Sequence, residues 1–294
     1  MKRLTVIVGP TAIGKTREAI RRARELDTEI VSCDSRQFYH ELNIGVARPT
    51  PDELAAAPHH FIACRSVRDP YNAYTYAEAA LQCLETLFAT HDEVIAVGGS
   101  GLYIDALCQG INLLPDPTPE LRAQLSQRLN EGGLADMLDE LRLHDPETYA
   151  TIDRNNPIRV QRALEVILTS GRPYSQLLRQ PLPPRPFEVR KIGLYCSRDT
   201  LRERIDQRID AMVEQGLLDE VRQLVPLRDL PALHTVGYQE LFPYLDGKQP
   251  LERAIVEIKS HTWQYAKKQM TWLKRYNEIT WLEQKKNFAP NASF

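Results

Sequence analysis

The chain has 294 residues, of which 43% are hydrophobic and 26% are charged, and its formal net charge is −2 at pH 7. This length and composition suit one large or two modest globular domains, and the near-neutral charge does not by itself indicate nucleic-acid binding. The five cysteines are scattered and form no C-x-x-C pair, which excludes a structural zinc site and indicates a reduced, cytosolic chain.

Hydropathy excludes two further classes of protein. The N-terminal stretch MKRLTVIVGP has too short an apolar run for a signal peptide. No run in the chain approaches the length of a membrane span. We therefore expect a cytoplasmic protein without a membrane partner.

The first predicted element is a strand at residues 3–8 that leads into a phosphate-binding loop. The segment from Leu4 to Val8 is apolar or β-branched, and the segment after the loop has helical spacing. The loop between them satisfies G-x-x-x-x-G-K-[ST] in the strand–helix context that this motif requires. Its residues are Gly9, Pro10, Thr11, Ala12, Ile13, Gly14, Lys15 and Thr16.

This loop predicts a polyphosphate ligand. Its glycines allow successive backbone N–H groups to point at an anion, and the helix that starts at Lys15 adds its positive N-terminal end. Lys15 can reach the terminal phosphate, and the Thr16 hydroxyl can ligate Mg²⁺. The motif does not specify a nucleoside triphosphate, and a glycine-rich turn without a ligand is the alternative.

Alternating strand and helix patterns follow the loop. Strands are predicted at residues 29–33, 60–64 and 93–97, with helical apolar spacing between them, as in AEAALQCLETLFATH. This alternation predicts an α/β fold with a doubly wound, mostly parallel sheet. The ligands of such a sheet bind at the carboxyl ends of its strands.

The second predicted strand ends in EIVSCDSRQFY, so Asp34 lies beside the phosphate loop if the first two strands are neighbours. An acid at this place in P-loop proteins can act as a base or hold Mg²⁺. The alternative is an N-cap for a helix whose first turn contains residues 35–37. One carboxylate can serve both purposes.

The fourth predicted strand leads into VGGSGLYIDAL, a tight turn at the same edge of the sheet. Gly98, Gly99 and Gly101 let a ligand approach the backbone, and Ser100 can hydrogen-bond a phosphate or a substrate. The turn does not match the nucleophile elbow G-x-S-x-G or the dinucleotide fingerprint G-x-G-x-x-G. A turn that serves only packing is the alternative.

A helical module interrupts the α/β core. Three prolines in five residues from Pro115 mark a boundary, and RQPLPPRPFE forms a linker back to the strand VRKIGLYC. We therefore predict a helical insertion at residues 116–189 between core segments 1–115 and 190–294. Helical patterns fill residues 198–276, and EITWL is a candidate last strand.

The segment LRERIDQRIDAMVEQG contains Arg204 and Arg208 four residues apart on one helical face. Such a pair can clamp a pyrophosphate with bidentate hydrogen bonds. The alternative is a solvated face, because acidic residues are interleaved with these arginines.

The C-terminal region is basic and aromatic. From Lys259 to Lys286 there are six lysines and one arginine against two glutamates, and all three tryptophans lie in this stretch. Such a mixture suits RNA, whose bases stack on rings while cations contact phosphates. The alternative is an amphipathic helix with a solvated basic face. Four arginines of the insertion form a second basic candidate: Arg154, Arg159, Arg162 and Arg172.

Taken together, these segments resemble the tRNA dimethylallyltransferases (tRNA isopentenyltransferases). The matching pieces, in the family's order, are GPTAIGKT, DSRQFY, GGSGLY, NPIRVQRALEVILTSG, RIDQRIDAMVEQG, VGYQEL and YAKKQMTWLKR. Ser100 stands where the family commonly has threonine, which keeps the hydroxyl. On this resemblance we expect a protein similar to the bacterial type, without the C-terminal zinc finger of eukaryotic cytosolic members.

The resemblance implies a P-loop NTPase-like fold and transfer of a dimethylallyl group from dimethylallyl diphosphate to tRNA. The acceptor is the exocyclic amine of the adenosine 3′-adjacent to the anticodon. The family roles map onto Lys15 and Mg²⁺-bound Thr16 at the diphosphate, Asp34 as base, and Ser100 and Arg208 as assisting residues.

The resemblance also implies that the insertion and the basic helix bind the anticodon stem-loop. We expect the protein to act as a monomer. The expected tRNA-binding residues are Asp34, Ser35, Arg36, Gln37, Ser100, Arg122, Arg159, Arg162, Lys267, Lys268, Gln269, Trp272 and Lys274.

Three other functions remain open from the sequence. A small-molecule P-loop kinase shares the loop and the acid, but it would transfer from ATP. An adenylate isopentenyltransferase that uses a free nucleotide has no use for the basic, aromatic C-terminal region. A nucleotide-gated RNA-binding module without chemistry would not require Asp34.

Overall fold

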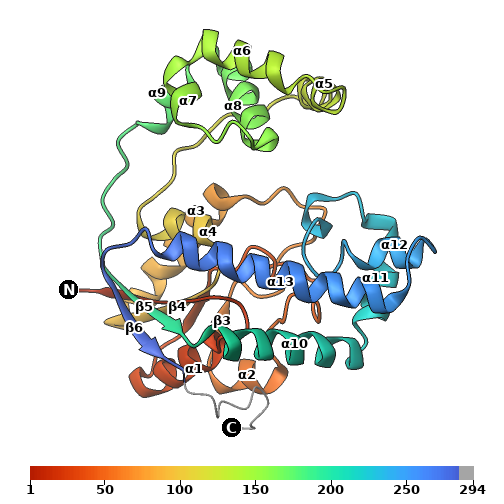
Figure 1. Ribbon diagram of the computed structural model, residues 1–294. Coiled ribbons are helices and arrows are strands. Elements are labelled where there is room, and N and C mark those ends of the chain that lie inside the picture. The colour runs from red at the N-terminus through yellow and green to blue at the C-terminus, as the bar shows by residue number, and fades with distance from the viewer. Residues whose placement is uncertain (285–294) are drawn as a thin grey trace. The chain divides into compact units, whose positions relative to one another are not determined.

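The computed structural model describes residues 1–284. The chain divides into two compact units (Figure 1): a larger unit of residues 1–109 with 185 onward, and an inserted unit of residues 110–184. The expected limits of 116 and 189 differ from these by five or six residues. The first of the prolines that suggested the N-terminal limit, Pro115, lies inside the inserted unit and not at its first residue, Gly110.

The described residues form one sheet of six parallel strands in the order β3-β2-β4-β1-β5-β6. The strands are β1 (Arg3–Val8), β2 (Ile30–Ser32), β3 (His59–His60), β4 (Glu93–Val97), β5 (Glu188–Tyr195) and β6 (Ile279–Glu283). This sheet confirms the predicted α/β fold and includes EITWL as its last strand. However, β1 and β2 are not neighbours, because β4 lies between them and pairs with both.

Alternating side chains of the strands build a separate core on each face of the sheet. Ile7 and Ile95 point into one core, and Val6 and Ala96 point into the other. This alternation is the two-residue period of a strand that is buried on both faces. Each fully buried aliphatic side chain contributes about 1.5–3 kcal/mol, so covering both faces is a large part of the unit's stability.

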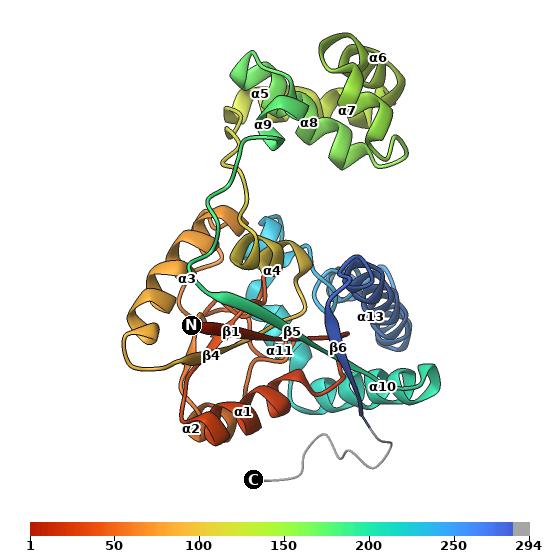
Figure 2. The same ribbon diagram turned by 90° about the vertical axis from the view of Figure 1, so that its left-hand side faces the viewer.

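Helices cover the two faces (Figure 2). One core includes residues from α1 (Lys15–Leu26), α10 (Arg198–Glu214), α11 (Leu217–Leu224) and α12 (Leu241–Leu245), next to α2 (Pro51–Ala56) and the short 3₁₀ turns η1 (Val225–Leu227) and η2 (Pro231–Leu233). The other core includes residues from α3 (Ala73–Phe88) and α4 (Gly101–Cys108). The long helix α13 (Leu251–Leu273) contributes to both cores.

The inserted unit is helical and has its own core. It contains α5 (Pro119–Asn130), α6 (Leu134–His144), α7 (Pro146–Thr151), α8 (Pro157–Ser170) and α9 (Tyr174–Leu178). Leu125, Met137, Leu141 and Leu164 are fully buried in its centre. The start of α8 follows from sequence, since the Asn156 side chain accepts a hydrogen bond from the Arg159 N–H and a proline follows it.

Part of the basic C-terminal region lies outside the described residues, including Lys285, Lys286 and the segment NFAPNASF. Within residues 1–284, no helix combines the length and the apolar character that crossing a membrane requires.

Candidate active site

Three loops meet at one edge of the sheet because all of its strands are parallel. The phosphate loop follows β1, the segment with Asp34 follows β2, and the turn at residues 98–101 follows β4. A cavity of about 740 Å³ opens at this edge. It lies at the carboxyl ends of the strands, where ligands of doubly wound folds bind. The position of Asp34 at the cavity therefore does not depend on β1 and β2 being neighbours.

The backbone of the phosphate loop is set by its glycines. Gly9 has a φ of 153°, and a Cβ atom there would lie 2.9 Å from the carbonyl oxygen of Leu194. Gly14 has a φ of 99° and precedes α1 without a side-chain cap. The first N–H groups of α1 therefore lack a capping side chain at the cavity, and such groups bind anions.

Lys15 is the central cation of the cavity. Its Nζ donates a hydrogen bond to the carbonyl oxygen of Pro10 at 2.8 Å. Burial and then the nearby Arg208 guanidinium lower the pKa of Lys15 to about 7, against a smaller opposing effect of the Asp34 carboxylate. An anion at the loop would reverse this shift, because it favours the protonated amine.

The two arginines of α10 have different roles. Arg208 donates from Nη1 to the Thr11 hydroxyl at 3.2 Å, and burial lowers the pKa of its guanidinium. Arg204 is only 7% exposed and donates to the carbonyl oxygen of Ile13 at 3.4 Å. Both line the cavity, and we interpret Arg208 as the ligand-facing cation and Arg204 as a support for the loop.

Asp34 lines the same cavity and also stabilises its own turn. Its Oδ1 accepts hydrogen bonds from the N–H groups of Arg36 at 2.9 Å and Gln37 at 3.4 Å. The residues that follow form a turn and not the first turn of a helix. These N–H groups fix the carboxylate, so Asp34 stabilises this turn and is also a candidate base; it does not cap a helix.

Ser100 connects the turn after β4 to the segment with Asp34. Its hydroxyl accepts from the Ser35 N–H at 3.0 Å and donates to the Ser35 hydroxyl at 3.1 Å. The side chain is 9% exposed. At Gly98, a Cβ atom would lie 2.3 Å from the carbonyl oxygen of Cys33, so only glycine allows this close approach.

Gln269 lies in the interior of the larger unit, which differs from the tRNA contact expected of it. It is 7% exposed, accepts from the Thr11 N–H at 2.8 Å and donates to the carbonyl oxygen of Gly99 at 2.9 Å. Helical spacing explains this position, because Gln269 shares the inward face of α13 with Thr262, Ala266 and Leu273. Gln269 therefore ties the phosphate loop to the turn after β4.

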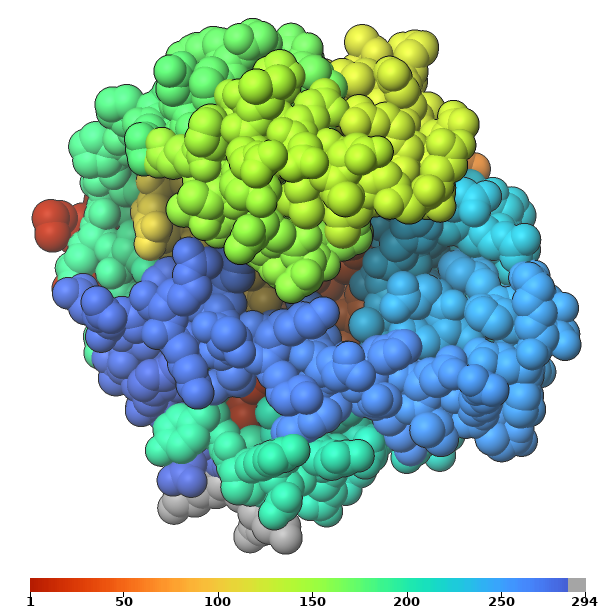
Figure 3. Space-filling model, turned by 45° about the horizontal axis from the view of Figure 1, so that its top comes forward, coloured from red at the N-terminus to blue at the C-terminus, as the bar shows by residue number. Residues whose placement is uncertain are grey.

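Trp272 is half-buried against the same turn, since a Cβ atom at Gly101 would lie 2.5 Å from its ring. The basic residues around it face outward: Lys267, Lys268, Lys274 and Arg275 are exposed. The Arg275 guanidinium lies 4.6 Å from the centre of the Trp272 ring. Figure 3 shows α13 exposed along the surface of the larger unit.

The expected RNA-binding arginines of the inserted unit differ in their exposure and in their ion pairs with carboxylates. Arg159 is exposed. Arg162 lies 3.3 Å from Glu165 and 3.5 Å from Asp116. Arg122 lies 3.7 Å from Glu165, although half of its side chain is exposed. A phosphate would have to compete with these carboxylates at Arg122 and Arg162.

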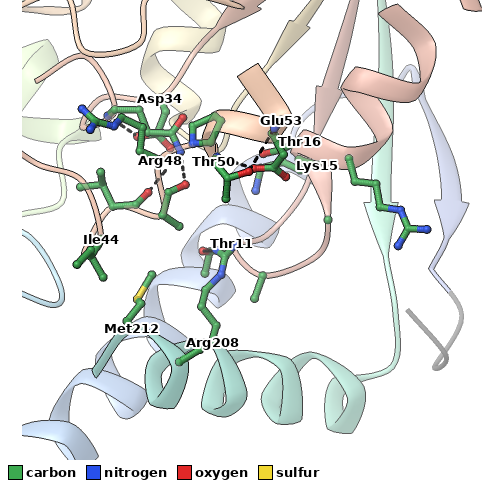
Figure 4. Close-up of a pocket in the computed structure, with 18 of the residues that line it drawn as sticks. Thr11, Lys15, Thr16, Asp34, Ile44, Arg48, Thr50, Glu53, Arg208 and Met212 are labelled. Atoms are coloured by element: carbon green, nitrogen blue, oxygen red, sulfur yellow. Dashed lines mark hydrogen bonds between the residues drawn. The ribbon is translucent and has the colours of Figure 1, made fainter. Parts of the chain in front are cut away.

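One wall of the cavity was not predicted. Residues 43–50 connect the turn after β2 to α2, whose first residues 51–53 belong to the same wall, and no motif identifies them as a site. Figure 4 shows Ile44 and Met212 on one side of the cavity and Lys15 and Thr16 on the other. The wall carries both polar and apolar side chains that line the cavity: Asn43, Ile44, Val46, Ala47, Arg48, Pro49, Thr50, Pro51, Asp52 and Glu53. The one sequence feature that could have indicated this wall is Arg48, a basic residue in the loop IGVARPTPDE.

No group of three His, Cys, Asp or Glu side chains that could hold a metal is present within residues 1–284. The Thr16 hydroxyl lines the cavity. This arrangement fits Mg²⁺, which keeps several waters and binds through few protein ligands together with substrate phosphates.

Comparisons with known proteins agree with the geometry. The family model described as IPP transferase matches residues 37–276. A tRNA dimethylallyltransferase from Christiangramia forsetii is 47% identical over 92% of this chain and 89% of its own length. A tRNA isopentenylpyrophosphate transferase structure from Bacillus halodurans has a TM-score of 0.71 and 34% identity over 96% of this chain and 90% of that chain.

A structure of a eukaryotic dimethylallyltransferase acting on tRNA has a TM-score of 0.77 and 25% identity, and the match covers 96% of this chain and 74% of that chain. The family match and the similarity to its relatives both extend over most of the sequence. This chain therefore belongs to the IPP transferase family.

Proposed function

We propose that this protein transfers a dimethylallyl group from dimethylallyl diphosphate to the exocyclic amine of the adenosine 3′-adjacent to the anticodon in tRNA, releasing diphosphate. The observation that carries the proposal is a single cavity that contains the phosphate loop, the Asp34 carboxylate and an apolar wall with Ile44 and Met212. A polyphosphate leaving group, a base and an allyl chain each have a matching surface there. The names of the relatives support the same reaction.

The diphosphate end of the cavity is suited to a leaving group. Breaking the allylic C–O bond puts negative charge on the departing diphosphate. The N–H groups at the start of α1, the Lys15 ammonium and the Arg208 guanidinium surround the place where this charge develops. They stabilise the transition state more than the ground state, which is how such electrostatic groups accelerate a reaction.

We propose that the Thr16 hydroxyl would hold Mg²⁺, which would supply positive charge to neutralise the diphosphate. Lys15 and Arg208 orient the leaving group, and α1 keeps its N–H groups directed at it.

Asp34 accepts the proton that the adenosine amine must lose. The amine nitrogen forms a bond to the allylic carbon while the C–O bond breaks, and the N–H proton passes to the carboxylate. The N–H groups of Arg36 and Gln37 hold the carboxylate in place. A base of this kind contributes about 10²–10⁴-fold to the rate.

The exposed cations of α13 are proposed to bind the anticodon stem-loop, with Lys267, Lys268 and Lys274 near phosphates and Arg159 as a further contact on the inserted unit. The adenine must leave its stack, which costs a few kcal/mol, and these contacts offset the cost. The free cysteines of the described residues and a tRNA substrate fit a cytoplasmic enzyme, which we propose acts as a monomer.

Radiolabelled dimethylallyl diphosphate offered with bulk tRNA or with AMP tests the proposal, with ATP supplied separately. We expect Mg²⁺-dependent labelling of tRNA, no labelling of AMP and no ATP turnover. Efficient labelling of AMP would indicate an enzyme for free nucleotides, and ATP turnover at a comparable rate would indicate a kinase. Binding of tRNA without any transfer would indicate an RNA-binding module.

A further inference from the structure

Residues 43–48 carry Ile44 and Val46, which form part of the apolar wall of the cavity. One carboxylate outside the cavity holds this segment. Glu220 of α11 accepts hydrogen bonds from three consecutive backbone N–H groups, those of Asn43 at 3.3 Å, Ile44 at 2.7 Å and Gly45 at 3.2 Å. The Tyr238 hydroxyl donates to the same carboxylate at 2.5 Å. Four donors on two oxygens leave the carboxylate well satisfied, and hydrogen bonds to an ionised group are the stronger kind.

Packing and a second anchor restrict the same segment. The Tyr238 ring lies so close to Gly45 that a Cβ atom there would be 2.5 Å from it. On the cavity side, Gln37 donates from Nε2 to the carbonyl oxygens of Val46 at 3.3 Å and Ala47 at 2.9 Å. Residues 43–48 contain no helix or strand, so their position is determined by these anchors and not by a regular hydrogen-bonding pattern.

Tyr238 remains a hydrogen-bond donor to this carboxylate. Burial, followed by the Glu220 carboxylate, raises the pKa of Tyr238 far above its ordinary value, so the phenol keeps its proton.

Ile44 and Met212 lie on the side of the cavity across from Lys15 and Thr16 (Figure 4), and Val46 of the anchored segment also lines the cavity. A diphosphate fixed at the loop extends its hydrocarbon chain toward this wall. An apolar surface alone discriminates weakly between chain lengths, because extra methylenes gain favourable burial. Rejection of a longer chain requires a wall that does not move, as a close-packed and hydrogen-bonded segment provides.

We propose that Glu220 is a positioning residue that fixes residues 43–48 and thereby sets the length of allylic diphosphate that the cavity accepts. The proposal rests on the proposed function, since it assigns the apolar wall to the allyl chain. Glu220 does not line the cavity, so it acts through the backbone of the wall and not on the substrate.

The test compares the parent with Glu220→Gln, which keeps the shape of the side chain but replaces an acceptor oxygen with an N–H donor facing the backbone. Tyr238→Phe removes one donor and keeps the ring against Gly45. Asp219→Asn is the matched control, because Asp219 is an exposed neighbour on the same helix, where it forms an ion pair with Arg222. Calorimetry measures binding of dimethylallyl and geranyl diphosphate, and kinetics measures transfer to tRNA.

For Glu220→Gln we expect the KM for dimethylallyl diphosphate to rise about tenfold, the effect of losing one charge-assisted hydrogen bond, with kcat changed less. The preference for the five-carbon over the ten-carbon diphosphate should fall by a similar factor. Tyr238→Phe should shift both quantities in the same direction by less, and Asp219→Asn should shift neither.

A lowered melting temperature with unchanged KM and unchanged chain-length preference would overturn the proposal, since it would show a purely structural role. If Glu220→Gln does not fold, Tyr238→Phe tests the proposal through the same KM and the same chain-length preference. Binding is measured without transfer. A parent that binds both diphosphates but modifies no tRNA would therefore refute the proposed function, while the chain-length preferences of parent and variants could still be compared from binding alone. A parent that binds neither diphosphate would refute both.

Discussion

The pKa of Lys15 predicts that diphosphate binding takes up a proton. The free protein holds this pKa at about 7, through burial first and Arg208 second, whereas the ordinary lysine value is about 10.4. At pH 8 about nine-tenths of the amine is therefore neutral, by the ordinary titration relation. A bound diphosphate requires the ammonium form, so binding at pH 8 must protonate Lys15.

The pH dependence of diphosphate affinity follows from the cost of protonating Lys15. Each pH unit above 7 costs about 1.4 kcal/mol to protonate the amine before it can pair with the anion. Affinity for dimethylallyl diphosphate should therefore fall about tenfold between pH 8 and pH 9, and be nearly constant below pH 6.5, apart from the titration of the ligand itself.

The same depressed pKa destabilises the unliganded fold at low pH. Since the unfolded chain binds more protons between pH 7 and about 10.4, the Lys15 contribution to stability rises with pH over that window.

Calorimetry in buffers of different ionisation enthalpy measures the proton uptake. We expect nearly one proton taken up per diphosphate at pH 8 in the parent. Lys15→Arg is the control, because arginine stays protonated throughout this range and its uptake should be near zero. Equal uptake in the parent and in Lys15→Arg, or no uptake in the parent at pH 8, would refute the reasoning.

Three further predictions concern catalysis, the tie between loops and RNA binding. Asp34→Asn should reduce turnover by about 10²-fold or more with little change in tRNA affinity, and near-parent turnover would mean that Asp34 serves only to stabilise its turn. Gln269→Leu leaves two part-buried backbone groups without this partner, at up to about 1–3 kcal/mol each. Thermal melts should show lower stability and kinetics a higher KM for the diphosphate, whereas an unchanged KM would separate Gln269 from the phosphate loop. Replacing Lys267 and Lys268 by glutamine should lower the salt dependence of tRNA binding by about 0.7 per lost single-strand contact and leave diphosphate binding unchanged, as should Arg159→Gln; an unchanged slope in stably folded variants would mean that these cations are a solvated surface.

Local patterns in the sequence were enough for the phosphate loop and for most of the elements. The strand predicted at residues 60–64 was wrong in extent, because β3 contains only His59 and His60. Strand β1 is a short apolar run bounded by glycine, and the loop after it is defined by residues that are adjacent in the chain. The helical insertion could be predicted for the same reason, because its proline-rich flanks and helical spacing are local features. Its limits were displaced by a few residues, since compactness and not composition decides where a unit ends.

Pairings between distant residues were decided only by the tertiary structure. The placement of β4 between β1 and β2 depends on strand pairing, which apolar strands of similar pattern do not specify. The inward position of Gln269 depends on which face of α13 packs on the sheet, and its partner Thr11 is 258 residues away in sequence. Glu220 holds a loop 175–177 residues upstream, and nothing in the local pattern of either segment indicates the other. Periodicity determines which residues share a face, but the packing of whole elements determines what that face contacts.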